Sequence, residues 1–364
     1  MSDMGCSLEI IYMPNKKLSI LLSPTHRCNM RCEYCYVSNN NHFDMSKEDF
    51  YALYNWLAEY AKHLNISTID FTWFGGEPLL YGVSSMRSAL DLQSRFFDSC
   101  RIKCINRIQS NLTLINKDWC CLLKEYFSSF IGGSFEPFEE YRKYANGSSA
   151  KIDIEQKIEF LRESNIKVGI VCTLMKKNLP KANILYNWFA SHVDSFRVNR
   201  AHSPIGVRND DYMSVDEYNR YVLDLFDIYI RDKSSTVKFT NFDVLANSIK
   251  NKKPLVCIDG NTPWKKIAIA GNGEISSYCR VSHRILGNYY KSTPEEVINA
   301  YRNGFNKSAI TTCDKCDFFQ KKICAGNCYG EPEKNCYQSQ CGYRTECTKE
   351  IIAYIVNYLD KMKI

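Results

Sequence analysis

Short apolar runs alternate with longer stretches of helical period through the first half of the chain. Such runs, bounded by polar and turn-forming residues, are typical of buried strands. We expect strands at residues 18–23, 67–74, 107–110, 129–135, 167–174 and 195–199. Helical stretches lie between them, for example Ser46 to His63, where Ser46 fits an N-cap with Asp49 three residues later.

Strands that alternate with helices predict a parallel sheet with crossover connections. Six such units indicate an α/β fold built as a partial (β/α)6 barrel of the TIM type. Chemistry in such barrels lies on the loops at the C-terminal ends of the strands. The domain prediction is an N-terminal segment at 1–17, the barrel at 18–232, a small cysteine-rich domain at 233–348 and a closing helix at 349–364.

Composition narrows the class of protein. With 364 residues, of which 45% are hydrophobic, the chain can bury a large core. The net charge of +7 comes without a long basic run, so we expect no nucleic-acid partner. No apolar run approaches the length of a membrane span, and the polar start lacks a signal-peptide layout. We therefore expect a soluble, cytoplasmic protein with no membrane partner.

Cysteine is the unusual component, with 18 residues in a chain that otherwise resembles an intracellular enzyme. In a reducing compartment this excess favours metal binding over a disulfide framework. Cys28, Cys32 and Cys35 follow the first expected strand with three and then two residues between them. Three thiolates on one loop can hold three irons of a 4Fe-4S cluster and leave the fourth iron open. A structural zinc site is less favoured, because it needs four ligands and no CxxC partner lies near in sequence.

A second motif follows the second expected strand. The turn consists of Gly75, Gly76, Glu77 and Pro78. Two glycines let a backbone approach a ligand closely, and a carboxylate in that place can pair with an ammonium group.

The segment SPTHRCNMRCEYCY, with the aromatic Tyr34 before the last cysteine, resembles the CxxxCxxC signature of the radical SAM superfamily. The GGEP turn resembles a second motif of that family, and IQSNLTLI and IGGSFEP resemble its third-strand and fourth-strand segments. The resemblance implies that the open iron binds the amino and carboxylate groups of S-adenosyl-L-methionine (SAM). It also implies a SAM pocket formed by Tyr34, Gly75, Gly76, Glu77, Pro78, Ser110, Asn111, Ser134 and Arg142, with Glu77 at the amino group and Ser134 and Arg142 at the carboxylate.

The C-terminal cysteines resemble the SPASM domain, including a glycine, Gly273, before the second cysteine and a CAGNC block. Two gaps are longer than that pattern usually has. The resemblance implies two auxiliary 4Fe-4S clusters. The outer one would be held by Cys313, Cys316, Cys324 and Cys347, and the inner one by Cys257, Cys279 and Cys328. Either the inner cluster keeps an open iron or Cys336 or Cys341 completes it. A zinc ribbon is the alternative for this block.

The family resemblance implies an oxidoreductase that cleaves SAM to a deoxyadenosyl radical, using an electron donor such as flavodoxin or ferredoxin. Relatives with a SPASM domain mostly modify peptides, so we expect a precursor peptide as substrate and a thioether or carbon-carbon (cyclophane) crosslink as product. The alternative is formylglycine formation, as in anaerobic sulfatase maturases. Those enzymes carry an acidic residue after the cysteine equivalent to Cys279, whereas this chain has Arg280, which cannot act as a base.

Two further alternatives remain open from the sequence. One is a radical SAM dehydrogenase acting on a small molecule. The other is a zinc-binding interaction protein without catalytic activity. The sequence assigns no catalytic residue.

Overall fold

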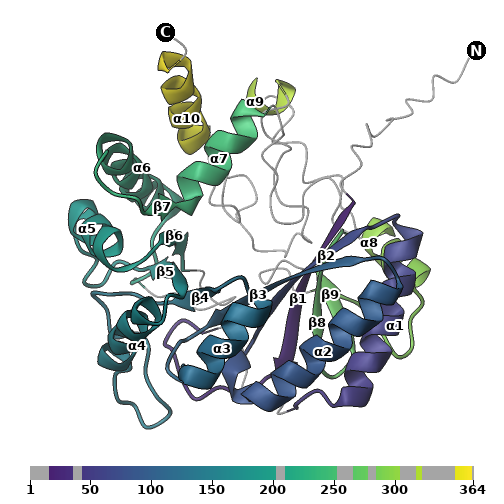
Figure 1. Ribbon diagram of the computed structural model, residues 1–364. Coiled ribbons are helices and arrows are strands. Elements are labelled where there is room, and N and C mark those ends of the chain that lie inside the picture. The colour runs from purple at the N-terminus through teal and green to yellow at the C-terminus, as the bar shows by residue number, and fades with distance from the viewer. Residues whose placement is uncertain are drawn as a thin grey trace, which may run out of the picture.

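The computed structural model describes residues 16–35, 43–201, 210–251, 265–277, 284–303, 317–321 and 349–362. Within them the strands form one sheet in the order β10-β9-β8-β1-β2-β3-β4-β5-β6-β7. Each neighbouring pair from β1 to β7 is parallel. The expected α/β partial barrel is therefore confirmed, and Figure 1 shows its strands fanning out beside the helices.

All six predicted strands are present. The strands are β1 (Lys17–Thr25), β2 (Thr68–Gly75), β3 (Lys103–Ser110), β4 (Phe130–Ser134), β5 (Lys167–Leu174), β6 (Ser195–Arg200), β7 (Lys238–Phe239), β8 (Lys266–Ala270), β9 (Glu274–Ser277) and β10 (Ile285–Asn288). Strand β3 begins earlier than its apolar run suggested. Its polar residue Arg107 is held by Asp70 of β2, with 3.0 Å between guanidinium Nε and carboxylate Oδ1. The first half of this strand also carries polar residues, Lys103 and Asn106, which hid it from a hydrophobicity pattern.

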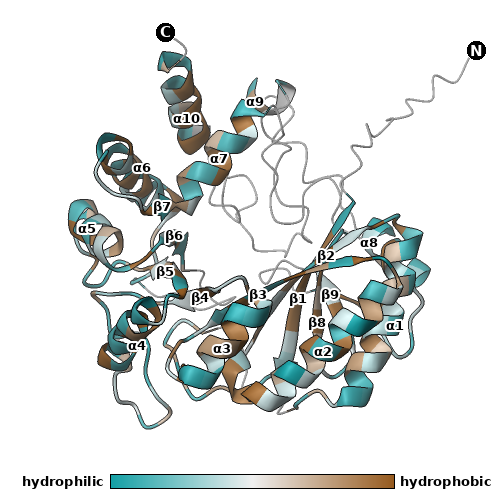
Figure 2. Ribbon diagram, in the orientation of Figure 1, coloured by the Kyte–Doolittle hydropathy of each residue, from teal (hydrophilic) through white to brown (hydrophobic). Residues whose placement is uncertain are grey.

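Helices follow most of these strands. They are α1 (Lys47–His63), η1 (Pro78–Tyr81, a 3₁₀ helix), α2 (Val83–Ser99), α3 (Lys117–Tyr126), α4 (Lys151–Glu163), α5 (Ala182–His192), α6 (Val215–Arg231), α7 (Thr240–Lys250), α8 (Pro294–Asn303), α9 (Asp317–Gln320) and α10 (Lys349–Lys361). The expected cap of α1 is present, because Ser46 and Asp49 form a reciprocal capping box. In Figure 2 the helices carry both apolar and polar segments, as expected of helices that pack against a sheet on one side.

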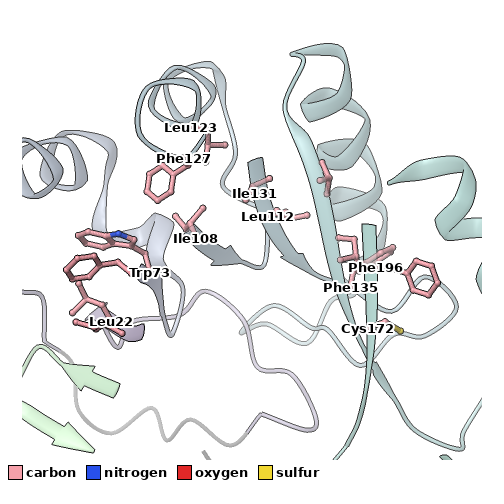
Figure 3. Close-up of a cluster of buried hydrophobic side chains, with 14 of the residues drawn as sticks. Leu22, Trp73, Ile108, Leu112, Leu123, Phe127, Ile131, Phe135, Cys172 and Phe196 are labelled. Atoms are coloured by element: carbon pink, nitrogen blue, oxygen red, sulfur yellow. The ribbon is translucent and has the colours of Figure 1, made fainter. Parts of the chain in front are cut away.

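The core lies between the strands and the helices that cover them. Trp73 is fully buried, and its indole Nε1 donates to Asn106 Oδ1 at 2.8 Å, so its polar atom is also satisfied. Figure 3 shows apolar side chains from neighbouring strands, among them Ile108 and Ile131, gathered with Phe127 from the end of α3. This packing fixes the strand ends from which the loops of the candidate site emerge.

The sheet continues past residue 232, where we expected the barrel to end. Strand β7 pairs with β6, and β8 pairs in parallel with β1. Strands β9 and β10 extend the same edge in antiparallel fashion. The described part of the C-terminal region is thus joined to the barrel by backbone hydrogen bonds. Among the described residues, no helix is long and apolar enough to span a bilayer.

Candidate active site

The cysteines of the first cluster lie on the loop that follows β1. Cys28 and Cys32 are partly buried, Cys35 is exposed, and all three are free thiols. The backbone N–H of Met30 donates to Cys28 Sγ at 3.4 Å, and that of Cys35 donates to the carbonyl oxygen of Cys32 at 3.0 Å. The loop is therefore a compact turn that carries three sulfur atoms. We call residues 26–35 the cysteine loop.

The cysteine loop is held by the segment 141–144, which follows β4. The backbone N–H of Arg31 donates to the carbonyl oxygen of Lys143 at 2.7 Å, and that of Glu33 donates to Tyr141 at 3.1 Å. The Lys143 ammonium also pairs with the Glu33 carboxylate at 2.6 Å. These contacts fix the backbone on both sides of Cys32, the middle cysteine.

Burial disfavours the charged form of two of these thiols. It raises the pKa of Cys28, and it raises the pKa of Cys32 to about 11, although the nearby Arg142 guanidinium acts in the opposite direction. Iron-sulfur clusters bind thiolates, so a bound cluster would reverse this preference.

The donor set fits an iron-sulfur cluster better than a single metal ion. Among the described residues, no three His, Cys, Asp or Glu side chains converge as the ligands of one ion would. A cubane cluster does not need that convergence, because each thiolate binds a different iron atom. Three thiols on one short loop satisfy this requirement.

The two glycines of the GGEP turn bring β2 against the base of the cysteine loop. A Cβ atom on Gly76 would lie 2.3 Å from the carbonyl oxygen of Arg27 and 2.5 Å from that of His26. Gly75 has a φ of +144°, and the N–H of Gly76 donates to the carbonyl oxygen of Thr25 at 3.2 Å. The close approach that Gly76 permits is therefore to the cysteine loop itself, whereas Gly75 lies against Thr25 at the end of β1.

Glu77, the third residue of this turn, is buried with 1% of its surface exposed. Its carboxylate accepts hydrogen bonds from the Ser110 hydroxyl at 2.8 Å and from the backbone N–H groups of Leu79 at 3.0 Å and Asn111 at 2.7 Å. Burial raises the pKa of Glu77 to about 7, and these hydrogen bonds oppose the rise. Pro78 begins η1 directly after Glu77 and needs no N–H partner there. A carboxylate has about four acceptor positions, so one remains for a further donor.

Asn111 links this carboxylate to the cysteine loop. Its side-chain Nδ2 donates to Asn29 Oδ1 at 2.9 Å, and Asn29 Nδ2 donates to Thr113 Oγ1 at 2.9 Å. The ends of the first three strands therefore meet in one hydrogen-bond network. The structure brings Glu77, Ser110 and Asn111 together, and it adds Asn29 and Thr113, which the sequence did not single out.

Ser134 lies outside that network. Its Oγ accepts a hydrogen bond from Gln109 Nε2 at 2.8 Å. Both side chains are partly buried, and they connect the ends of β3 and β4.

Arg142 lies beside the cysteine loop in a buried ion pair. Its guanidinium Nε is 2.8 Å from Glu136 Oε2, and Nη2 also donates to the Tyr34 hydroxyl. The Tyr34 hydroxyl donates to Glu136 Oε1 at 2.8 Å, and the backbone N–H of Thr173 donates to the same oxygen at 3.0 Å. The remaining terminal nitrogen, Nη1, is 3.9 Å from Cys32 Sγ. The expected SAM-pocket residues Tyr34 and Arg142 are thus joined both directly and through Glu136.

Two buried carboxylates were not predicted. Glu136 carries a local signal, since it lies within the IGGSFEP segment that the sequence singled out. Glu139 has none: it is buried with 8% of its surface exposed, and neither carboxylate oxygen has a hydrogen-bond partner in the described part of the chain. Burial raises the pKa of Glu139 to about 7.

The second cysteine cluster lies outside the described residues. This applies to Cys257, Cys279, Cys313, Cys316, Cys324, Cys328, Cys336, Cys341 and Cys347. Of the cysteines outside both patterns, Cys120 and Cys172 are buried packing residues, whereas Cys100 and Cys121 are exposed.

This chain is similar to known proteins both over its barrel and over most of its length. Residues 22–181 match the family model described as the Radical SAM superfamily. A serine-type anaerobic sulfatase-maturating enzyme from Bacteroides thetaiotaomicron is 25% identical over 96% of this chain and 92% of its own length. A cysteine-type anaerobic sulfatase-maturating enzyme from Clostridium perfringens (strain 13 / Type A) is 24% identical over 85% of this chain and 88% of its own length.

One similar solved structure is described as native anSMEcpe with bound AdoMet and Kp18Cys peptide. It has a TM-score of 0.77 and 21% identity, and the match covers 95% of this chain and 99% of that chain. The likeness extends over both the barrel and the C-terminal region of this chain.

Proposed function

The chain carries a radical SAM domain, and from that premise we propose that it is a maturase that oxidises a serine or cysteine side chain of a peptide segment. The observation that supports this most is the near full-length similarity to a serine-type sulfatase-maturating enzyme. The sequence by itself favours a crosslinking product, because Arg280 stands where the sulfatase maturases carry an acidic residue. The relatives support the sulfatase-maturase-like alternative better than that main prediction.

The described residues divide into those that would hold the cluster and those that would hold SAM. Cys28, Cys32 and Cys35 would bind the 4Fe-4S cluster, and the free acceptor position of Glu77 would receive the SAM ammonium group. Together, the bound cluster and SAM supply abstraction of a hydrogen atom from an unactivated carbon.

The chain's own residues would position the cofactor groups and exclude water from the site. Ser110 and Asn111 keep Glu77 oriented, and Gly75, Gly76 and Pro78 shape the turn that carries it. Ser134 lies near the end of β4, where it can receive a further polar group of SAM. These residues are rigid because each is hydrogen-bonded or closely packed, which favours a preorganised pocket.

We also propose that the C-terminal cysteines hold two auxiliary 4Fe-4S clusters. Oxidation of a serine side chain to an aldehyde removes a hydrogen atom, a proton and one further electron. The same loss from cysteine gives a thioaldehyde, which water then hydrolyses to the aldehyde with release of hydrogen sulfide. Either oxidation needs an electron acceptor near the substrate. The likeness to sulfatase-maturating enzymes over the C-terminal region supports this assignment. A flavodoxin or ferredoxin would supply the reducing electron at the first cluster.

Arg280 supports a second candidate function. An acidic residue in that place would accept the substrate proton, and a guanidinium cannot. A peptide maturase that forms a thioether or carbon-carbon crosslink remains the competing proposal for this reason.

The test is anaerobic turnover with the Kp18Cys peptide as the first substrate. The reconstituted protein, SAM and a strong reductant should yield deoxyadenosine and a peptide aldehyde that forms a hydrazone. The variant with Cys28, Cys32 and Cys35 changed to Ala should yield neither, whereas a control with Cys100 and Cys121 changed to Ala should behave as wild type. Deoxyadenosine together with peptide that has lost hydrogen but forms no hydrazone would favour crosslinking. A colourless, zinc-loaded protein without deoxyadenosine would overturn the enzyme proposal.

A further inference from the structure

Residues of the barrel strands alternate between two faces of the sheet. Ile108, Ile131 and Phe196 are buried on the face that packs against the helices, and Figure 3 shows them in that cluster. Their neighbours along each strand point to the opposite face, which we call the barrel lumen. On that face Gln109 lies over Gly132, where an added Cβ would come within 2.4 Å of Gln109 Oε1.

The lumen face of strands β1 to β7 carries more basic than acidic side chains. All seven strands lie within the described part of the chain, and Asp70 is their only acidic residue. Asp70 is shared by two cations, Lys17 and Arg107. One carboxylate therefore faces a clear excess of positive charge. The basic residues at lumen positions are Lys17, Lys103, Arg107, Lys167, Arg197 and Lys238.

The lysines of this set have an ordinary explanation, whereas the arginines do not. Each lysine is the first residue of its strand, and a lysine at the rim of a sheet is usually a solvated group. Arg107 and Arg197 lie inside β3 and β6, and both are exposed. The inside of a closed barrel is normally filled by packed apolar side chains. Two exposed arginines in this lumen therefore indicate a polar, negatively charged occupant.

Arg197 lies on the same row of the sheet as Ser134. Ser134 pairs with Val171 of β5, and Val171 pairs with Arg197 of β6. Neighbouring strands are about 4.8 Å apart, so the Cα atoms of Ser134 and Arg197 are separated by about 10 Å. Arg197 Nε donates to Asn199 Oδ1 at 2.9 Å, and Asn199 lies two residues nearer the carboxyl end of β6. The guanidinium is thus directed toward the end of the sheet where SAM is proposed to bind.

We propose that the barrel lumen selects a peptide segment with an acidic side chain close to the serine or cysteine that is oxidised, and that Arg197 binds that carboxylate. This inference rests on the proposed function and names the class of its peptide substrate. A guanidinium can hold a carboxylate by two parallel hydrogen bonds, which gives both affinity and orientation. The excess of positive charge attracts an acidic segment and repels a basic one.

The test measures how the anaerobically reconstituted full chain binds peptides that differ in one charge. The peptides are versions of Kp18Cys with Glu, Gln or Lys two residues before or after the cysteine, and Ala replaces the cysteine itself. Fluorescence anisotropy of labelled peptides in the presence of SAM reports affinity without turnover. In one of the two series, the Glu peptide should bind roughly 10-fold or more tightly than the Gln peptide, as expected for hydrogen bonds to a charged group. The Lys peptide should bind more weakly than the Gln peptide.

Three variants assign this preference to one side chain. Arg197→Gln should abolish the difference between the Glu and Gln peptides, and Arg197→Lys should keep part of it, because the charge remains but the two-pronged geometry is lost. Arg95→Gln, at an exposed position of α2, is the matched control and should keep the full difference. With cysteine-containing peptides, Arg197→Gln should lower kcat/KM for the Glu peptide more than for the Gln peptide. A merely structural defect would lower both alike.

Each outcome separates this inference from the proposed function. Equal affinities of the three peptides for wild type would overturn the selectivity, and aldehyde formation from them would leave the proposed function standing. A Glu preference that persists in Arg197→Gln would overturn the role of Arg197. Selective binding with no hydrogen loss from any peptide, although deoxyadenosine forms, would contradict the proposed function. If Arg197→Gln does not fold, wild type still decides: salt screens charges, so a Glu preference that does not weaken at high salt would contradict an ionic contact.

Discussion

The side-chain amide of Asn111, at the end of β3, donates a hydrogen bond of 2.9 Å to Asn29 in the middle of the cysteine loop. The backbone N–H of the same asparagine donates to Glu77 at 2.7 Å. One residue thus joins the loop that carries the thiols to the carboxylate proposed to receive SAM. These two hydrogen bonds hold the cysteine loop and Glu77 in a fixed arrangement.

Asn111→Ala should loosen the cysteine loop without removing a thiol. The substitution removes the hydrogen-bond donor to the side-chain oxygen Oδ1 of the partly buried Asn29. It keeps the backbone hydrogen bond from residue 111 to Glu77. An unsatisfied buried polar group costs about 1–3 kcal/mol, so the free energy of unfolding should fall by about that amount. Denaturant unfolding measures the loss, and chelators should remove iron faster. Asn55→Ala, at an exposed position of α1, is the control and should change neither quantity.

Glu77→Gln should weaken SAM binding. The amide keeps the shape of the side chain but loses the charge that would pair with the SAM ammonium, and a hydrogen bond to a charged group contributes about 1.5–3 kcal/mol. The affinity should therefore fall roughly 10-fold to 100-fold. Calorimetry on the anaerobic, reconstituted protein tests this against Glu125→Gln, an exposed carboxylate paired with Arg87. Equal affinities for wild type and Glu77→Gln would remove Glu77 from the SAM pocket.

The same carboxylate predicts a pH dependence of SAM affinity. Burial raises the pKa of Glu77 to about 7, so the charged form that pairs with an ammonium group is lost as the pH falls through that value. SAM affinity should decrease from pH 8 to pH 6. Glu77→Gln should show a flatter profile, and a parallel decline in both proteins would assign the titration to another group.

Gly76→Ala should disrupt cluster binding through the backbone. The added Cβ would lie 2.3 Å from the carbonyl oxygen of Arg27, so either the GGEP turn or the cysteine loop must shift. We expect the iron content of the reconstituted protein to fall well below that of wild type. Gly147→Ala is the matched control, because a Cβ there has no atom within 4 Å and the cost is only that of a positive φ. Normal iron loading of Gly76→Ala would show that the contact can relax.

Glu139 should make the protein less stable as the pH rises. Its pKa is raised from 4.5 to about 7 in the folded state, so the folded protein holds this proton more tightly than the unfolded chain does. The free energy of unfolding should therefore decline as the pH rises from about 4.5 to about 7 and then level off. Glu139→Gln should reduce the decline, and the slope that remains should include the contribution of Glu77. Unfolding of the cluster-free protein across this pH range measures both, and identical slopes in wild type and variant would contradict the prediction.

The amino-acid sequence alone determined the positions of six barrel strands and the places of the two main motifs. Apolar runs and caps are local signals, so β1, β2, β4, β5 and β6 were predicted within two residues at either end. The cysteine loop and the GGEP turn follow directly from the ends of their strands. The family resemblance of IQSNLTLI assigned Ser110 and Asn111 to the SAM pocket, and the structure shows that both donate hydrogen bonds to Glu77.

Only the tertiary structure decided which side chains are partners. Tyr34 and Glu136 are 102 positions apart in the chain, and Arg142 and Cys32 are 110 apart. No local pattern encodes such pairs, because they depend on how two loops fold over the end of the sheet. Burial likewise belongs to the folded molecule: it raises the pKa of Glu77 and Glu139 to about 7, whereas the sequence shows two ordinary glutamates. The residue types therefore determine which chemistry the site can perform, whereas the electrostatics of the site arise from the packing around those residues.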